Sequence, residues 1–277
     1  MVGIIAAMNE ELAPLLNMVD GAGNNILSGV RIFELGSAAV ESICRRVRSD
    51  DFKLFDEEIL VEFGAVNREE RNGFTFFRGK INGTDCIFAR SGIGKVNAAA
   101  CTQTLIDVFG AEYIINCGSA GSLDSVASYG DVVIAEECVQ WDFDLTAFGH
   151  PQGFIPSCGR FFRTNLSLLE LCHRISGFSA ELGFKCLCGR IASSDSFVSN
   201  EEKKLWLRKE FSALCTEMES APTAMVCSLS EVPCICIRSI SDSASEDASS
   251  KEFYSNLNLA SANSAVFVYI MILSLNG

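Results

Sequence analysis

The chain contains few histidines, prolines and tryptophans: its 277 residues include two His, five Pro and two Trp. His150 and His173 are far apart in the sequence and follow no ligand spacing, so a zinc site is not expected. Basic residues are also scarce, since 22 Lys and Arg face 35 Asp and Glu, for a formal net charge of −13. A surface of this sign repels a polyanion, which makes nucleic acid an unexpected partner.

The sequence also lacks a basic segment before its first apolar run, and it has no apolar run of membrane length. The first run starts at Val2, so we expect no signal peptide. The longest apolar stretch, residues 265–275, is shorter than the about 20 residues that a membrane-spanning helix needs. We expect this stretch to be the core face of a terminal helix, and we expect no membrane partner.

Cysteine, in contrast, is frequent, with 13 residues scattered through apolar runs. Cys186 and Cys188 form one CxC pair, and Cys234 and Cys236 form another. Such pairs can hold a metal or act in redox chemistry, but both lie in strand-like segments, where thiols fill apolar volume. Free buried thiols suit a reducing compartment, so a cytoplasmic protein is expected.

Strand-like apolar runs alternate with helical patterns along the chain. Strands are predicted at 2–7, 74–78, 85–90, 113–117, 131–135, 186–192 and 234–240, and helices at 10–18, 96–109, 164–175, 201–211, 220–229 and 258–275. Asn82-Gly83 is a strong hairpin signal between two of the strands. The alternation predicts an α/β fold, a three-layer single domain over residues 1–277 with a central mixed sheet flanked by helices.

Residues 24–71 do not fit this alternation. They contain a charged helical stretch at 41–52 and a strand-like stretch at 58–63. Their charge density favours a surface excursion rather than a part of the core, so we predict an inserted segment at about 24–71.

Carboxylates follow three apolar runs. Glu10 and Glu11 come directly after the first run, Glu217 and Glu219 end another, and Asp242 ends the last expected strand. A carboxylate there is costly unless it has a partner or a task, and acids from separate strand ends form acid/base sites. Each acid alone could instead cap or complement a helix, but their common placement favours a site.

Two segments of small residues also follow strands. Gly92-x-Gly94 has Asn97 in place of a third glycine and lacks a phosphate-loop ending, so a tight strand-to-helix turn explains it equally well. Residues 118–122 are predicted to form a second loop, whose N–H groups would be open to a close ligand.

Seven motifs occur in order along the chain. They are GIIAAMNEE (3–11), SGIGKV (91–96), INCGSAG (115–121), DLTAFG (144–149), DSF (195–197), EME (217–219) and RSISD (238–242). This series resembles the bacterial methylthioadenosine/S-adenosylhomocysteine nucleosidases of the nucleoside phosphorylase superfamily, and the similarity is interrupted mainly at 24–71. The resemblance implies hydrolysis of the N-glycosidic bond of adenosine derivatives with release of adenine, without a metal or a cofactor.

The resemblance also implies roles for individual residues. Asp242 would protonate the purine as adenine leaves, Glu11 would deprotonate the attacking water, and Glu219 would bind the ribose hydroxyls. The implied substrate-binding residues are Met8, Ile93, Ser119, Gly121, Phe197, Val198, Met218, Glu219, Arg238 and Ser241. The residues implied to reach into a neighbouring subunit are Leu145, Phe148 and Pro156, so a homodimer is expected.

Water is the expected nucleophile rather than phosphate. Asn116 stands where related phosphorylases carry an arginine, and Glu11 would repel phosphate. The sequence departs from the family at Asn9 and Ser194, and it leaves open whether Phe253 or Tyr254 closes the pocket. The alternatives are a nucleosidase for aminodeoxyfutalosine or 5′-deoxyadenosine, a purine or uridine phosphorylase, and a non-catalytic nucleoside-binding protein on the same fold.

Overall fold

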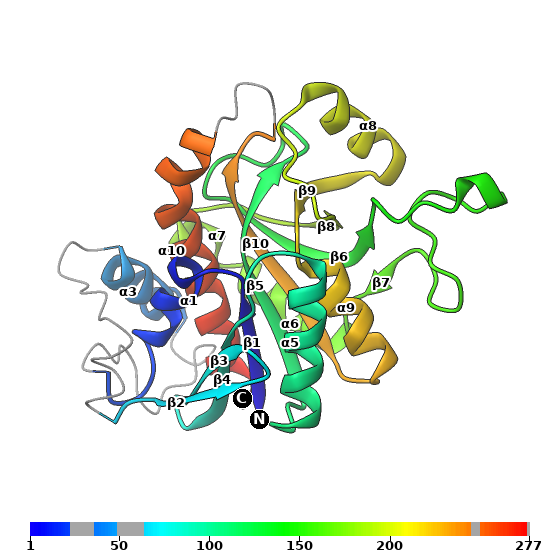
Figure 1. Ribbon diagram of the computed structural model, residues 1–277. Coiled ribbons are helices and arrows are strands. Elements are labelled where there is room, and N and C mark those ends of the chain that lie inside the picture. The colour runs from blue at the N-terminus through cyan, green and yellow to red at the C-terminus, as the bar shows by residue number, and fades with distance from the viewer. Residues whose placement is uncertain (23–35, 49–63, 245–249, 276–277) are drawn as a thin grey trace.

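The computed structural model describes residues 1–22, 36–48, 64–244 and 250–275 (Figure 1). The strands are β1 (Val2–Ala6), β2 (Asn67–Arg71), β3 (Phe74–Ile81), β4 (Thr84–Arg90), β5 (Tyr113–Ser122), β6 (Val132–Gln140), β7 (Phe162–Arg163), β8 (Cys186–Ser193), β9 (Ala213–Glu217) and β10 (Cys234–Asp242). The helices are α1 (Asn9–Leu16), α3 (Ser37–Val47), α5 (Lys95–Asp107), the short 3-10 helix η1 (Thr146–Phe148), α6 (Leu166–Ser176), α7 (Ser179–Leu182), α8 (Glu201–Phe211), α9 (Ser220–Leu229) and α10 (Ser250–Ser274).

The described strands form one mixed sheet, part of which closes on itself. β5, β9, β8, β6 and β10 pair in succession, and β10 pairs back to β5. β1, β4, β3 and β2 extend the sheet from β5 as an open edge. The closure places Gly121 of β5 beside both Thr216 of β9 and Asp242 of β10. Three strand ends that are distant in the sequence therefore meet at one point.

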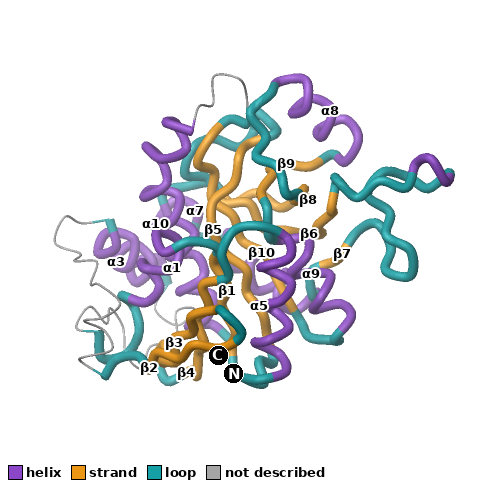
Figure 2. Tube along the Cα trace, viewed as in Figure 1, coloured by secondary structure: helices purple, strands orange, loops and turns teal. Residues whose placement is uncertain are grey.

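Helices cover both faces of the sheet (Figure 1, Figure 2). One core cluster joins the sheet to α1, α3 and α10, and another joins it to α5 and α9. Neighbouring residues of a strand alternate between the clusters, since Ile4 lies in the first and Ile5 in the second. This arrangement confirms the predicted three-layer α/β class with a mixed sheet.

Helix α10 is the terminal helix predicted for the core. Within the described residues it alone has the length and apolarity to cross a membrane, over Phe253–Ser274 with a mean hydropathy of 1.6. However, 83% of its apolar window is buried inside the protein, and Phe267 and Tyr269 are fully buried. The helix is longer than the apolar stretch at 265–275 suggested, and its place in the core is confirmed.

The hairpin signal is confirmed, whereas the loop predicted at 118–122 is wrong. Asn82 and Gly83 join β3 to β4 with φ values of 48° and 77°, as a type I′ turn requires. Residues 118–122 continue β5 instead of leaving it. Their small side chains serve close packing, because a Cβ on Gly118 would lie 2.6 Å from Glu11 Oε1. No bounds were predicted for β9, although Glu217 and Glu219 were expected to follow a strand, and Glu217 ends β9.

The prediction of a surface excursion at 24–71 is wrong for α3, whereas the exposed residues of β2 agree with it. Val40 and Ile43 of α3 are fully buried in the core cluster that contains α10. Charged residues of this helix, such as Arg45, lie on its exposed side. β2 pairs with β3 as an edge strand. The strand-like stretch at 58–63 lies outside the described residues, and an insertion relative to the family stays a prediction.

All 13 cysteines are free thiols. Burial raises the pKa of Cys101 to about 12, and burial together with the Glu11 charge raises that of Cys117 to about 12. Cys234 and Cys236 are buried as predicted, while Cys186 and Cys188 are only half-buried at the edge of the core.

Candidate active site

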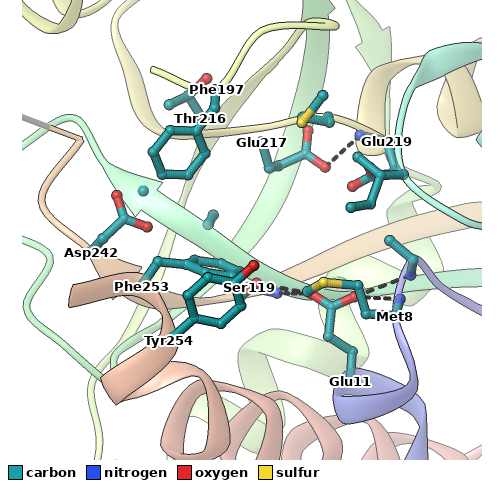
Figure 3. Close-up of a pocket in the computed structure, with 15 residues that line it drawn as sticks. Met8, Glu11, Ser119, Phe197, Thr216, Glu217, Glu219, Asp242, Phe253 and Tyr254 are labelled. Atoms are coloured by element: carbon teal, nitrogen blue, oxygen red, sulfur yellow. Dashed lines mark hydrogen bonds between the residues drawn. The ribbon is translucent and has the colours of Figure 1, made fainter. Parts of the chain in front are cut away.

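A cavity of about 300 Å³ opens where the ends of β5, β9 and β10 meet (Figure 3). The start of α1 and the turn before α5 complete its wall. Its lining residues are Ala7, Met8, Glu11, Ile93, Ser119, Ala120, Gly121, Phe197, Thr216, Glu217, Met218, Glu219, Asp242, Phe253 and Tyr254. Nine of the twelve residues predicted to bind or convert a substrate within one subunit are among them.

Glu11 is held rigidly in the cavity wall. It is the third residue of α1, and its Oε2 accepts the backbone N–H groups of Ala7 at 3.1 Å and Met8 at 3.2 Å. Its Oε1 accepts the backbone N–H of Ser119 at 2.8 Å and the Ser119 hydroxyl at 2.9 Å. Three of these donors are fixed backbone groups, whereas the Ser119 hydroxyl can rotate towards another acceptor. The carboxylate is therefore fixed in place with one exchangeable hydrogen bond.

Asp242 ends β10 and is 1% exposed. Its Oδ2 accepts the Ser241 hydroxyl at 2.9 Å, and its Oδ1 accepts the backbone N–H of Ala244 at 3.0 Å. A Cβ on Gly121 would lie 2.7 Å from Asp242 Oδ1, so only glycine leaves room for this carboxyl. Figure 3 shows Asp242 and Glu219 on opposite sides of the cavity.

Glu219 lies directly before α9 and accepts the backbone N–H of Gly94 at 2.9 Å. Burial first, and then the charge of Glu217, raise the pKa of Glu219 to about 8, against the opposing charge of Arg238. The carboxyl of Glu219 therefore holds a proton up to about neutral pH in the unliganded protein.

A buried network stands behind this side of the cavity. Arg238 is 1% exposed, and its Nη2 lies 2.6 Å from Glu217 Oε2 and 3.8 Å from Glu219 Oε2. It also donates to Ser220 Oγ at 3.0 Å and to Asn116 Oδ1. Burial alone would lower the pKa of Arg238, but the charges of Glu217 and Glu219 raise it overall. A charge buried this deeply requires such partners.

The hydrogen bonds behind the cavity define the positions of Glu217, Arg238 and Ser241. Glu217 Oε2 accepts the backbone N–H groups of Glu219 at 2.9 Å and Ser220 at 2.8 Å, so this carboxylate holds the start of α9 in place. Arg238 and Ser241 are not among the cavity-lining residues and lie behind Glu219 and Asp242 respectively. A direct contact of either side chain with substrate stays a prediction.

Aromatic and apolar side chains form the remaining wall. Phe197, which is 50% exposed, has its ring centroid 6.1 Å from that of Phe253 in an edge-to-face arrangement. Phe253 in turn contacts Tyr254 at 5.3 Å, so both residues left open by the sequence line the cavity. Met8 and Ile93 contribute apolar surface. Val198 lines a small adjoining lobe of about 30 Å³.

Leu145, Phe148 and Pro156 lie away from this cavity. They belong to the segment between β6 and β7, which projects from the body of the molecule (Figure 1). Phe148 is 79% exposed. The contribution of these residues to a neighbouring subunit stays a prediction.

Residues 49–272 match the sequence model of the Phosphorylase superfamily. The chain belongs to this superfamily. It is 37% identical over 224 residues to a 5′-methylthioadenosine/S-adenosylhomocysteine nucleosidase from a Geobacillus species, which covers 79% of this chain and 95% of that relative. An aminodeoxyfutalosine nucleosidase from Helicobacter pylori is 38% identical over 220 residues, which covers 78% of this chain and 94% of the relative.

Solved structures of this superfamily confirm the fold. A crystal structure of a 5′-methylthioadenosine/S-adenosylhomocysteine nucleosidase from Colwellia psychrerythraea, in complex with adenine, superposes with a TM-score of 0.79 at 30% identity. The match covers 99% of this chain and 95% of that chain. Because the similar proteins of this superfamily are nucleosidases, the chain is an N-glycosyl hydrolase, as predicted.

Because the pKa of Glu219 is raised, the free energy of unfolding of this protein depends on pH. Its folded pKa of about 8 lies above the ordinary 4.5, so the folded state holds the extra proton between these values. The free energy of unfolding therefore decreases as pH rises from 4.5 to 8. We expect Glu219→Gln to match the wild type near pH 4.5 and to exceed it by on the order of 4 kcal/mol at pH 8.

Urea unfolding of both proteins across this pH range measures the difference. Glu10→Gln is the control, since Glu10 is exposed and its removal is expected to give a flat difference. A difference for Glu219→Gln that does not grow with pH would contradict the assignment.

Gly118 provides a second test of the packing around the site. Gly118→Ala places a Cβ 2.6 Å from Glu11 Oε1 and even closer to the guanidinium of Arg238, so both side chains must move. We expect a loss of about 1–3 kcal/mol in the free energy of unfolding together with a strong fall in kcat. Gly83→Ala strains only the distant hairpin, where nothing lies within 4 Å, and is expected to reduce stability without changing kcat. Equal kcat values in the two variants would contradict the prediction.

Proposed function

We propose that this enzyme hydrolyses the N-glycosidic bond of 5′-methylthioadenosine and S-adenosylhomocysteine, releasing adenine and the 5-thio-ribose. The observation that carries the proposal is the presence of Glu11, Glu219 and Asp242 in one cavity with an aromatic wall at Phe197. Hydrolysis of a nucleoside requires these groups: a stacking surface for the base, a carboxyl group for the sugar, and an acid and a base for the two proton transfers.

Bond cleavage places positive charge on the ribose and negative charge on the leaving base. Asp242 donates the proton that lets adenine leave as a neutral molecule, with the Ser241 hydroxyl and the Ala244 N–H orienting its carboxyl. Glu219 binds the ribose hydroxyls through its carboxyl group, which burial and the charge of Glu217 keep protonated up to about neutral pH by raising its pKa.

The water attacks from the Glu11 side. Glu11 is kept in place by the N–H groups of Ala7, Met8 and Ser119 while it takes the water's proton. Rotation of the Ser119 hydroxyl frees one lone pair of Glu11 for this water. Asn116 already accepts a hydrogen bond from Arg238, so the position that carries an arginine in phosphorylases supports Arg238 here.

Met8, Ile93, Tyr254 and Phe253 offer apolar surface for the 5′ substituent. Aminodeoxyfutalosine is the second candidate substrate, because a similar relative carries that activity in its name and the adenine and ribose parts are shared. The test is kcat/KM for methylthioadenosine, S-adenosylhomocysteine, aminodeoxyfutalosine and 5′-deoxyadenosine. We expect methylthioadenosine and S-adenosylhomocysteine to have the highest kcat/KM. A kcat/KM for aminodeoxyfutalosine far above both would favour the second candidate.

We also propose a homodimer and a reducing cytoplasmic location. The exposed Phe148 on the projecting segment supports the first, because an apolar side chain there suits an interface. The 13 free thiols support the second.

A further inference from the structure

Three charged residues just outside the cavity have no role in the chemistry described above. Lys95 is the first residue of α5, Asp142 follows β6, and Asp195 lies in the loop after β8. Lys95 Nζ donates to Asp142 Oδ1 at 2.6 Å, and the other oxygen, Oδ2, accepts the backbone N–H of Asp195 at 3.2 Å. Asp195 Oδ1 accepts the backbone N–H of Lys95 at 2.8 Å. The three residues thus form a closed ring of hydrogen bonds.

Two members of this ring, Lys95 and Asp195, lie next to residues of the site. Gly94, next to Lys95, donates to Glu219, and Ile93 lines the cavity. Asp195 stands two residues before Phe197, the aromatic side chain of the cavity wall. Asp142 lies at the base of the projecting segment that carries Phe148. The ring therefore ties the Glu219 side of the cavity to its aromatic side.

The turn at Gly94 is built around the ring. Gly94 has a φ of +101°, and a Cβ there would lie 3.0 Å from Asp195 Oδ1. The carboxylate of Asp195 thus packs directly on the backbone that holds Glu219, so a shift of one is transmitted to the other.

The surroundings of the ion pair set it apart from a solvated surface pair. The side chains of Lys95 and Asp142 are 17% and 24% exposed. The Lys80–Asp85 pair, at 2.7 Å on the β3–β4 hairpin, has the same chemistry but side chains that are 55% and 65% exposed. A partly buried pair with further hydrogen bonds fixes geometry, whereas an exposed pair contributes little.

We propose that Lys95, Asp142 and Asp195 are positioning residues that hold the Phe197 loop at the correct spacing from the Gly92–Gly94 turn and so set the affinity for adenine. The inference rests on the proposed adenosine substrate. It concerns binding rather than chemistry, because the three side chains touch neither Glu11 nor Asp242 among the contacts described above.

The test compares Lys95→Met, Asp142→Asn and Lys95→Arg with the control Lys80→Met. We expect Lys95→Met and Asp142→Asn each to raise the adenine Kd and the KM by about tenfold, since misplacement of a binding surface by 1 Å weakens its contacts strongly. We expect kcat to stay within about threefold of wild type and Lys95→Arg to restore most of the affinity. The double variant that carries both Lys95→Met and Asp142→Asn is expected to bind adenine no more weakly than either single variant, because the two residues act through one interaction.

Unchanged adenine affinity in both Lys95→Met and Asp142→Asn would overturn the proposal. An equal loss of adenine affinity in the control Lys80→Met would also overturn it. A fall in kcat or melting temperature in Lys95→Met and Asp142→Asn without a change in the adenine Kd would do the same. Adenine affinity is measured by calorimetry without turnover. A wild type that binds adenine but does not cleave methylthioadenosine would therefore count against the proposed substrate alone, while one that binds no adenine would overturn both.

Discussion

Asp242→Asn is expected to lower kcat for adenine release by about 10²–10⁴-fold, because the amide cannot donate a carboxyl proton to the leaving base. The substitution keeps the shape of the side chain, and its Oδ1 can still accept the N–H of Ala244. The fold and the melting temperature should therefore stay close to those of the wild type. Saturation kinetics at several pH values, together with thermal unfolding, measure both effects.

Asp107→Asn is the matched control for this variant. Asp107 is exposed near the end of α5, where it accepts a hydrogen bond from Gln103 at 2.9 Å, and its replacement should leave kcat unchanged. Turnover of Asp242→Asn within a few-fold of the wild type would remove Asp242 from the role of general acid.

Glu11→Gln is expected to lose activity to a similar extent, about 10²–10⁴-fold in kcat, because an amide cannot take a proton from water. It should also lose stability. Both oxygens of Glu11 accept backbone N–H groups, from Ala7 and Met8 on one side and from Ser119 on the other. Whichever way the glutamine amide turns, its NH₂ group faces a donor, and such a mismatch costs about 1–3 kcal/mol.

Kinetics and urea unfolding separate these two consequences of Glu11→Gln. The neighbouring Glu10→Gln changes an exposed carboxylate of the same helix and is expected to alter neither quantity. Full activity in Glu11→Gln would exclude Glu11 as the base, and wild-type stability would show that its hydrogen bonds differ from those described.

The fold class and the acids of the site could be predicted because they leave local signals. Periodicity predicted α8 and α9 with the observed bounds, and the Asn82-Gly83 pair predicted the hairpin. Glu11 and Asp242 were found because each follows a strongly apolar run, which marks a strand end.

The closure of the sheet left no such signal. Gly118 and Gly121 have the composition of a loop, yet they continue β5, and a side chain at either position would collide with Glu11 or Asp242. The pairing of Gly121 with Thr216 and Asp242 depends on strand neighbours far apart in the sequence. Turn composition and close packing both select glycine, so the sequence could not distinguish them.

The contacts of the charged residues around the cavity could not be predicted from the sequence for a related reason. Lys95, Asp142 and Asp195 are separated by 47 and 53 residues, and no spacing rule connects them. Arg238 was assigned to the substrate by resemblance, while the structure shows its guanidinium against Glu217 and Glu219. Contacts of this kind depend on tertiary structure alone.

The most direct test of the central claim is the release of adenine from methylthioadenosine by the wild-type protein in phosphate-free buffer. We expect multiple turnovers that yield one adenine and one free thio-ribose for each substrate consumed, with a rate that added phosphate does not change. Adenine release that requires phosphate, or no release from any of the four adenosine derivatives, would contradict it.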